Sequence, residues 1–183
     1  MANTINLQSL DIYDVQLKIN KNNGDFYWYQ QRNVFEERVS SLYNLIAKEN
    51  FTHFFDVGAN YGYISVLVKR AKATIQVIAV EADPHLIPII KENLALNGIN
   101  DVTVINAIAA ESCQENQLFS INPNSSLDNR VNMPDWGKVQ VSTLTLDKII
   151  NDYCNMQSKI FLKIDTQGFE QFVLSGAEKS LNL

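Results

Sequence analysis

Residues 53–62, His53-Phe-Phe-Asp-Val-Gly-Ala-Asn-Tyr-Gly62, decide the fold of this chain. The aromatic and β-branched residues before Gly58 show no helical spacing, so they predict a short buried strand. Gly58 and Gly62 bracket a tight turn, and apolar residues then recur at helical spacing as far as Ala71. This order is typical of an open α/β sheet, in which the turn and the helix N-terminus face a ligand at the carboxyl end of the strand.

An acid precedes the first glycine of this turn. Asp56 lies near the end of a buried strand, where a charge is costly without a function or a partner. The dinucleotide fingerprint is G-x-G-x-x-G, whereas this pattern is Asp-x-Gly-x-x-x-Gly. A carboxylate there would repel a pyrophosphate but suits a cation or an amine, and S-adenosylmethionine carries both. These residues favour it over a nucleotide cofactor; the candidate cofactor-binding residues are Asp56, Gly58, Ala59, Asn60 and Gly62.

A second acid, Glu81, ends the apolar run 75–80. It follows the first glycine by about 20 residues, the spacing at which an acid at the end of the second strand binds a ribose. Alone, such a residue is a surface carboxylate. Together with the first turn, we interpret Glu81 as the acceptor for two ribose hydroxyls, with Ala82 beside it.

Residues 102–109 predict a third strand, and Asn106 and Ala107 lie near its end. An adenine would lie there in this architecture, where small residues let it approach the backbone. Residues 111–137 then depart from α/β alternation, with a long Pro/Asn/Ser-rich loop between two strands. Such loops are usually functional or mobile, so we interpret this one as a substrate-facing insertion; the alternative is an ordinary hairpin loop.

An acid also closes a later strand. Residues 159–164 read as a buried strand, and Asp165 follows it before another glycine and a helix that begins near Glu170. If the strands are parallel, Asp165 and Glu170 lie at the same edge of the sheet as Asp56 and Glu81.

Composition and charge bound the alternatives. The chain has 183 residues, 46% of them hydrophobic and 19% charged, which is typical of one globular domain. The net charge of −5 argues against nucleic acid as a partner. No apolar run approaches a membrane span, and no signal peptide is apparent. Cys113 and Cys154 are isolated, so we expect a cytoplasmic protein with no metal site.

The N-terminal region is polar and rich in asparagine. We expect residues 1–24 to form an extension that adds a short edge strand, and residues 25–183 to form the domain. The aromatic cluster 26–29 follows the turn at 22–25. It either caps the core or lines the mouth of a pocket.

In this order, the motifs resemble the FkbM family of S-adenosylmethionine-dependent methyltransferases, over residues 25–183. The segments that carry the resemblance are 56–62, 80–84, 93–97, 125–127, 143–147 and 162–170. The resemblance implies a class I, Rossmann-like α/β fold, an open and mainly parallel sheet with helices on both faces. It also implies methyl transfer to a hydroxyl of a sugar, a polyketide or another small metabolite.

The resemblance leaves the base to be found among this chain's own residues. A hydroxyl acceptor must lose its proton to a group within hydrogen-bond reach. Of the two histidines, His53 begins its strand at the wrong edge of the sheet and His85 follows the ribose acid. Asp165 is therefore the candidate base, with Lys163 and Glu170 as neighbours that orient it or shift its pKa.

The chain departs from the family in two respects. Thr166-Gln167 stands where the family more often has Val-Glu, and the chain stops at Leu183, before the last strands of the usual sheet. We therefore expect a C-terminally truncated sheet: the chain is a fragment, a minimal domain, or half of a sheet that another copy completes in a homo-oligomer. Two rival functions stay open, a truncated non-catalytic α/β domain and a nucleotide-dependent oxidoreductase.

Overall fold

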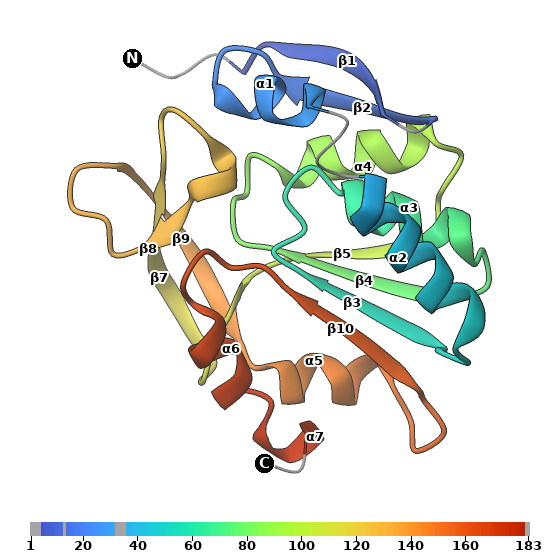
Figure 1. Cartoon of the computed structure of the whole chain (residues 1–183). Helices are drawn as coiled ribbons and strands as arrows, with labels where there is room; N and C mark the ends of the chain where they lie inside the picture. Colours follow the sequence, from blue (N-terminus) through green and yellow to red (C-terminus); the bar gives the residue numbers. More distant parts are fainter. Residues whose placement is uncertain (1–4, 13, 32–35, 182–183) are drawn as a thin grey trace.

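The computed structural model describes residues 5–12, 14–31 and 36–181 (Figure 1). Its centre is a sheet of four parallel strands in the order β10-β3-β4-β5. The strands are β3 (His53–Val57), β4 (Gln76–Glu81), β5 (Val102–Asn106) and β10 (Ile160–Ile164). Because all four run the same way, their carboxyl ends lie at one edge, as the sequence predicts.

Helices cover both faces of this sheet, which confirms the predicted fold class (Figure 1). One face carries α2 (Glu36–Lys48), α3 (Tyr63–Ala71) and α4 (Ile87–Leu96), and the other carries α5 (Leu146–Tyr153), α6 (Glu170–Ser175) and α7 (Glu178–Leu181). Successive side chains of β3 alternate between the two cores: Phe54 packs with α2 and α3, and Phe55 with α5 and α6. Within the described ranges, no helix has both the length and the apolar character that a membrane crossing requires.

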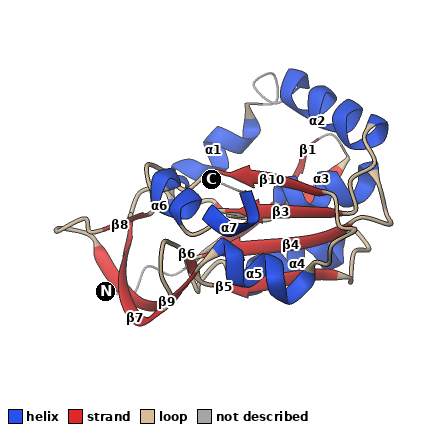
Figure 2. Ribbon diagram, turned by 90° about the horizontal axis from the view of Figure 1, so that it is seen from below, coloured by secondary structure: helices blue, strands red, loops and turns tan. Residues whose placement is uncertain are grey.

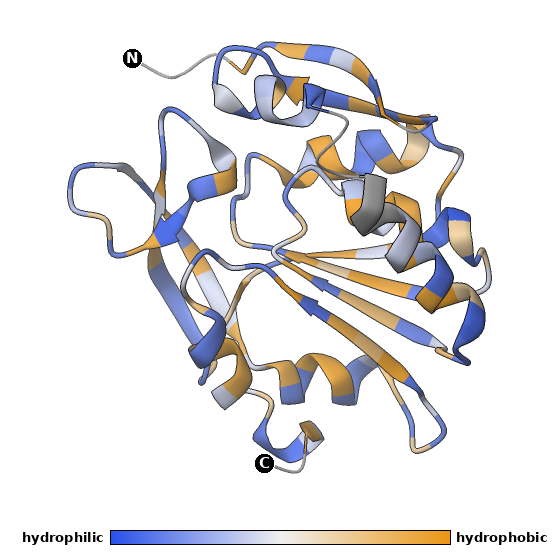
Figure 3. Ribbon diagram, in the orientation of Figure 1, coloured by the Kyte–Doolittle hydropathy of each residue, from blue (hydrophilic) through white to orange (hydrophobic). Residues whose placement is uncertain are grey.

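The central strands are apolar along most of their length, as the orange shading in Figure 3 shows. Every residue of β3 is buried, including His53 and Asp56. Burial on both faces is typical of a parallel sheet covered by helices, and it explains why these strands read as continuous apolar runs.

A second, mainly antiparallel sheet stands beyond the carboxyl ends of the central strands (Figure 2). Its strands, in the order β6-β9-β7-β8, are β6 (Ile108–Ala109), β7 (Gln114–Ile121), β8 (Arg130–Val131) and β9 (Gly137–Leu144). The prediction of one strand over 102–109 is therefore wrong. The chain leaves the central sheet at Ala107, because the next two residues pair with β9 instead.

The N-terminal residues form β1 (Leu7–Ile12), β2 (Val15–Asn20) and α1 (Gly24–Gln30), drawn in blue in Figure 1. The expected edge strand does not join the central sheet: in the described part of the chain, β1 and β2 form a separate two-stranded sheet. The reason is that β2 bonds to a helix: the side chain of Asn93 in α4 accepts from Lys18 N at 2.6 Å and donates to Lys18 O at 3.2 Å. The inner face of this hairpin is buried in the same core as α3 and α4.

Candidate functional site

The turn after β3 comes very close to the chain after β10. Gly58 has φ +76°, and a Cβ atom placed on it would lie 2.0 Å from the carbonyl oxygen of Asp165. Only glycine permits this approach, and only glycine adopts this φ without strain. The main-chain N–H groups of Gly58 and Ala59 also donate to Val80 O, at 2.9 and 3.1 Å. Three strand ends are thus held together at one point.

Glu81 lies beside this turn, and backbone groups hold both of its carboxylate oxygens. Oε2 accepts from Asn60 N at 2.7 Å, and Oε1 accepts from Asp83 N at 2.8 Å. The residue is only 7% exposed, and burial raises the pKa of its carboxyl to about 7, although the two donors lower it. Asn106 Nδ2 donates to the carbonyls of Glu81 and Ala82, so Asn106 fixes the backbone at this strand end.

Asp56 points into the protein rather than into an open cavity. It is fully buried, and its Oδ2 accepts from Ser65 Oγ at 2.7 Å. Its Oδ1 lies 2.9 Å from Lys163 Nζ, which also donates to Gly58 O at 2.7 Å. Asp56 and Lys163 therefore form an ion pair beneath the glycine turn, in which the carboxylate is fully buried and the Lys163 side chain is 23% exposed.

A cleft opens at this edge of the sheet, with about 640 Å³ of space including its mouth. We call it the cofactor cleft. Six of the predicted site residues line it: Gly58, Asn60, Glu81, Ala82, Ala107 and Asp165. Phe119 of β7 and Val131 of β8 form its outer wall, so the second sheet completes the cleft.

The three predicted catalytic residues do not form one cluster. Asp165 is exposed at the cleft, and its Oδ1 accepts from Gln167 Nε2 at 2.9 Å. Glu170 Oε1 instead accepts from the main-chain N–H groups of Thr166 and Gly168, at 2.9 and 3.1 Å. Burial alone would raise the pKa of Glu170, but these bonds hold it below its usual value. Glu170 thus fixes the turn that carries Asp165, while Lys163 faces Asp56.

Sequence reasoning missed Asp25, which is fully buried and bonds to Ser126, a residue that lines the cleft. Its Oδ2 accepts from Tyr61 Oη at 2.8 Å, from Ser126 N at 3.1 Å and from Ser126 Oγ at 2.6 Å. Asn60 Nδ2 donates to the same Ser126 Oγ at 3.0 Å. Asp25 therefore ties the 3₁₀ turn Ser126–Asp128 of the insertion to the glycine turn. The only sequence signal was the 22–25 turn, which gave no hint of this partner.

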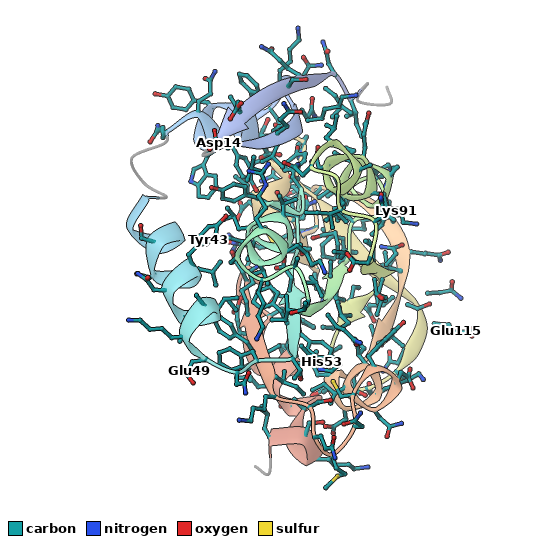
Figure 4. All side chains as sticks on the ribbon, turned by 90° about the vertical axis from the view of Figure 1, so that its right-hand side faces the viewer. Asp14, Tyr43, Glu49, His53, Lys91 and Glu115 are labelled. Atoms are coloured by element: carbon teal, nitrogen blue, oxygen red, sulfur yellow. The ribbon has the colours of Figure 1, made fainter. Side chains whose placement is uncertain are left out.

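The two histidines differ from Asp165 in their position and in their partners. His53, labelled in Figure 4, begins β3 at the edge opposite the acids. His85 Nδ1 lies 2.8 Å from Asp83 Oδ1, and Asp83 Oδ2 in turn accepts from Asn129 Nδ2 at 2.9 Å. In the part of the chain that the structure describes, no three His, Cys, Asp or Glu side chains gather as a metal site would require.

One family model matches this chain, over residues 56–183, and its description is "Methyltransferase FkbM domain". The match spans more than half of the chain and includes every segment that forms the cofactor cleft. It confirms the resemblance predicted from the motifs. No curated protein sequence matches the chain significantly.

Several solved structures resemble parts of the chain. An O-methyltransferase from Bacillus cereus covers 75% of this chain and 50% of its own, with 16% identity and a TM-score of 0.44. A SAM-dependent methyltransferase from Agrobacterium tumefaciens covers 57% and 33%, with 16% identity and a TM-score of 0.45. A precorrin-6y C5,15-methyltransferase from Geobacter metallireducens covers 39% and 38%, with 20% identity and a TM-score of 0.35. The chain spans at most half the length of these three, and likenesses this partial carry no assignment.

Proposed function

Because the chain belongs to the FkbM family of S-adenosylmethionine-dependent methyltransferases, we propose that it methylates a hydroxyl of a small metabolite such as a sugar or a polyketide. The observation that carries this proposal is the position of Glu81. A buried carboxylate lines the cofactor cleft, and its two oxygens accept hydrogen bonds from the backbone N–H groups of Asn60 and Asp83. The domain of this proposal spans residues 25–183, with 1–24 as an extension.

The residues of the cleft fit the cofactor. Ionised Glu81 has lone pairs left for a pair of ribose hydroxyls, because each of its oxygens accepts one backbone bond. Ala82 and Ala107 leave room for a flat base, and Asn106 holds the backbone that borders it. Gly58 and Asn60 present the turn to the rest of the cofactor. Gly62 lets α3 begin directly after this turn, with φ +80°.

In the reaction, S-adenosylmethionine supplies a methyl group already activated by its sulfonium. With the cofactor bound, the acceptor oxygen would bond to the methyl carbon as the carbon–sulfur bond breaks and S-adenosylhomocysteine is released, and Asp165 would take the hydroxyl proton. Its exposed side would then return the proton to solvent. Glu170 positions Asp165 by fixing the turn 165–168, and positioning of this kind supplies a large share of the acceleration.

The test is calorimetric titration of the folded chain with S-adenosylhomocysteine. The parent should bind, and Glu81→Gln should bind at least about 10-fold more weakly, since it loses the charge-assisted bonds to the ribose. Glu115→Gln, an exposed acid on β7 labelled in Figure 4, is the matched control and should bind like the parent.

Three other outcomes would count against the proposal. A folded parent that binds no S-adenosylhomocysteine would favour the non-catalytic alternative. Binding of NAD in its place would favour the oxidoreductase. Equal binding by the Glu81→Gln variant would remove Glu81 from the cofactor site. Once binding is established, release of S-adenosylhomocysteine in the presence of hydroxyl acceptors tests the transfer itself.

A further inference from the structure

A second cavity lies on the other side of the glycine turn, between α1, α2, α3 and β10. It holds about 1110 Å³ of space including its mouth. Its walls are mainly aromatic and aliphatic: Trp28, Tyr29, Leu42, Ile64, Leu67 and Phe161. We call it the aromatic pocket. It includes two members of the aromatic cluster 26–29, so that cluster does line a pocket.

The aromatic pocket adjoins the cofactor cleft. Four residues line both cavities: Gly58, Asn60, Leu127 and Asp165. The proposed base therefore stands at the boundary between them. A molecule in the aromatic pocket can present one end to Asp165 while the cofactor occupies the cleft, which is the arrangement that in-line transfer requires.

Two polar side chains, Lys163 and Asn60, lie where the aromatic pocket meets the glycine turn. Lys163 lines the pocket, but its ammonium is already bonded to Asp56 and to Gly58 O. Tyr29 Oη donates to Asn60 Oδ1 at 3.2 Å. Most of the other lining side chains are aliphatic or aromatic, and Trp28 and Tyr29 pack edge to face at 5.1 Å between ring centroids.

Apolar walls of this kind favour an acceptor whose own surface is mostly apolar. A free sugar would bury several hydroxyls against Leu42, Ile64 and Phe161, and each hydroxyl that lost its water without gaining a partner would weaken binding. An apolar ring meets no such cost and gains from burial against the aromatic end.

We propose that the aromatic pocket is the acceptor site, and that its ligand is an alcohol on an apolar, ring-bearing body, with the hydroxyl directed at Asp165. This proposal rests on the proposed function and narrows it, since it places free sugars outside the acceptor class.

The test titrates the chain, saturated with S-adenosylhomocysteine, with two probes: 4-nitrobenzyl alcohol and methyl glucoside. The alcohol should bind and the glucoside should not. Leu42→Trp fills the aromatic pocket from α2. It should lower the affinity for the alcohol at least about 10-fold, while S-adenosylhomocysteine still binds. Leu45→Trp, at an exposed position on the same helix that does not line the pocket, is the control and should bind both ligands like the parent.

A second measurement does not depend on the folding of the Leu42 variant. The chain has two tryptophans, so Trp136→Phe leaves Trp28 as the only one. A nitro-aromatic ligand bound in the aromatic pocket should quench Trp28 emission along the same curve that calorimetry gives.

Each contrary outcome has its own meaning. Saturable alcohol binding without quenching, or unchanged by Leu42→Trp, would overturn the acceptor site. So would tighter binding of methyl glucoside than of the alcohol. Loss of S-adenosylhomocysteine binding in Leu42→Trp alone would assign the pocket to the cofactor instead. If the folded parent fails to bind S-adenosylhomocysteine at all, the proposed function fails first, and that result is read before any probe is added.

Discussion

The main-chain N–H of Asn60 donates a 2.7 Å hydrogen bond to Oε2 of Glu81, and this bond joins the turn after β3 to the end of β4. The effect of burial on the pKa of this carboxyl nevertheless outweighs the effect of its hydrogen bonds, so the pKa of Glu81 rises to about 7. Near neutral pH the ligand-free protein is thus a mixture of ionised and protonated Glu81. Two predictions depend on this balance.

The first concerns cofactor affinity. A pair of ribose hydroxyls donates to the ionised carboxylate, so the ionised form binds more tightly and the affinity should rise with pH through about 7. We expect S-adenosylhomocysteine to bind about 10-fold more weakly at pH 6 than at pH 8. Calorimetry across this range measures it. Glu81→Gln should show weak binding with little dependence on pH; a parallel slope in this variant would assign the titration to another group.

The second concerns stability. The folded pKa of Glu81 lies above the ordinary value of 4.5, so the folded state holds this proton more tightly than the unfolded state does. The resulting stabilisation is full below about pH 4.5 and is lost as the pH rises through about 7. Over that window, the parent should lose about 3 kcal/mol of unfolding free energy relative to Glu81→Gln. Urea unfolding of both proteins at each pH measures the difference, and a constant difference would contradict the raised pKa.

A third prediction concerns the ion pair under the turn. Lys163→Met leaves the carboxylate of Asp56, which is fully buried, without its cation. We expect a loss of about 3–5 kcal/mol of unfolding free energy, as when one partner of a buried pair is removed. Lys148→Met breaks the exposed pair with Asp152 and should change the unfolding free energy little, because solvent screens that pair. Comparable losses in the two variants would mean that Asp56 is not buried in solution.

The fourth prediction separates steric exclusion from backbone strain at glycine. Gly58 and Gly98 have similar angles, φ +76° and φ +72°, but a Cβ atom on Gly98 would meet nothing within 4 Å. Gly98→Ala should therefore cost only the left-handed strain, about 1–2 kcal/mol. Gly58→Ala should lower the stability clearly more than Gly98→Ala does, because the turn must move away from Asp165. It should also weaken the binding of S-adenosylhomocysteine. Thermal unfolding of both variants decides; equal shifts would show that the turn yields without cost.

The edge of the sheet could be predicted because its signals are local. Asp56, Glu81 and Asp165 each follow or end a short apolar run in the sequence, and parallel strands bring such positions together. The direction of each side chain was not predictable. Whether Asp56 faces a ligand or Lys163 depends on a partner more than 100 residues away.

The elements that enclose the site were harder to predict for the same reason. The N-terminal hairpin bonds to Asn93, and the 3₁₀ turn Ser126–Asp128 bonds to Asp25, so both are placed by contacts of long sequence separation. Propensity and periodicity describe neighbours along the chain and carry no information about such partners. The order of the motifs along the chain indicated the family, but it did not indicate these contacts.

The fifth prediction tests the contact between Asp25 and Ser126, two residues that are far apart in the sequence. Asp25→Asn keeps the shape of the side chain but places an amide donor where Tyr61 and Ser126 both donate. A buried donor facing donors should cost about 1–3 kcal/mol of unfolding free energy. Because Ser126 precedes Leu127 in the wall of the cofactor cleft, S-adenosylhomocysteine should also bind several-fold more weakly.

The matched control for this prediction is Asp128→Asn in the same turn. Its carboxylate is partly exposed and pairs with Arg130, so it should change both quantities little. Urea unfolding and calorimetry on the two variants give the comparison. If Asp25→Asn lowers stability but leaves the affinity at the parent value, Asp25 supports the N-terminal segment without shaping the cleft. If it changes neither, the buried contact between Asp25 and Ser126 does not persist in solution, and the insertion closes the cleft by its apolar contacts alone.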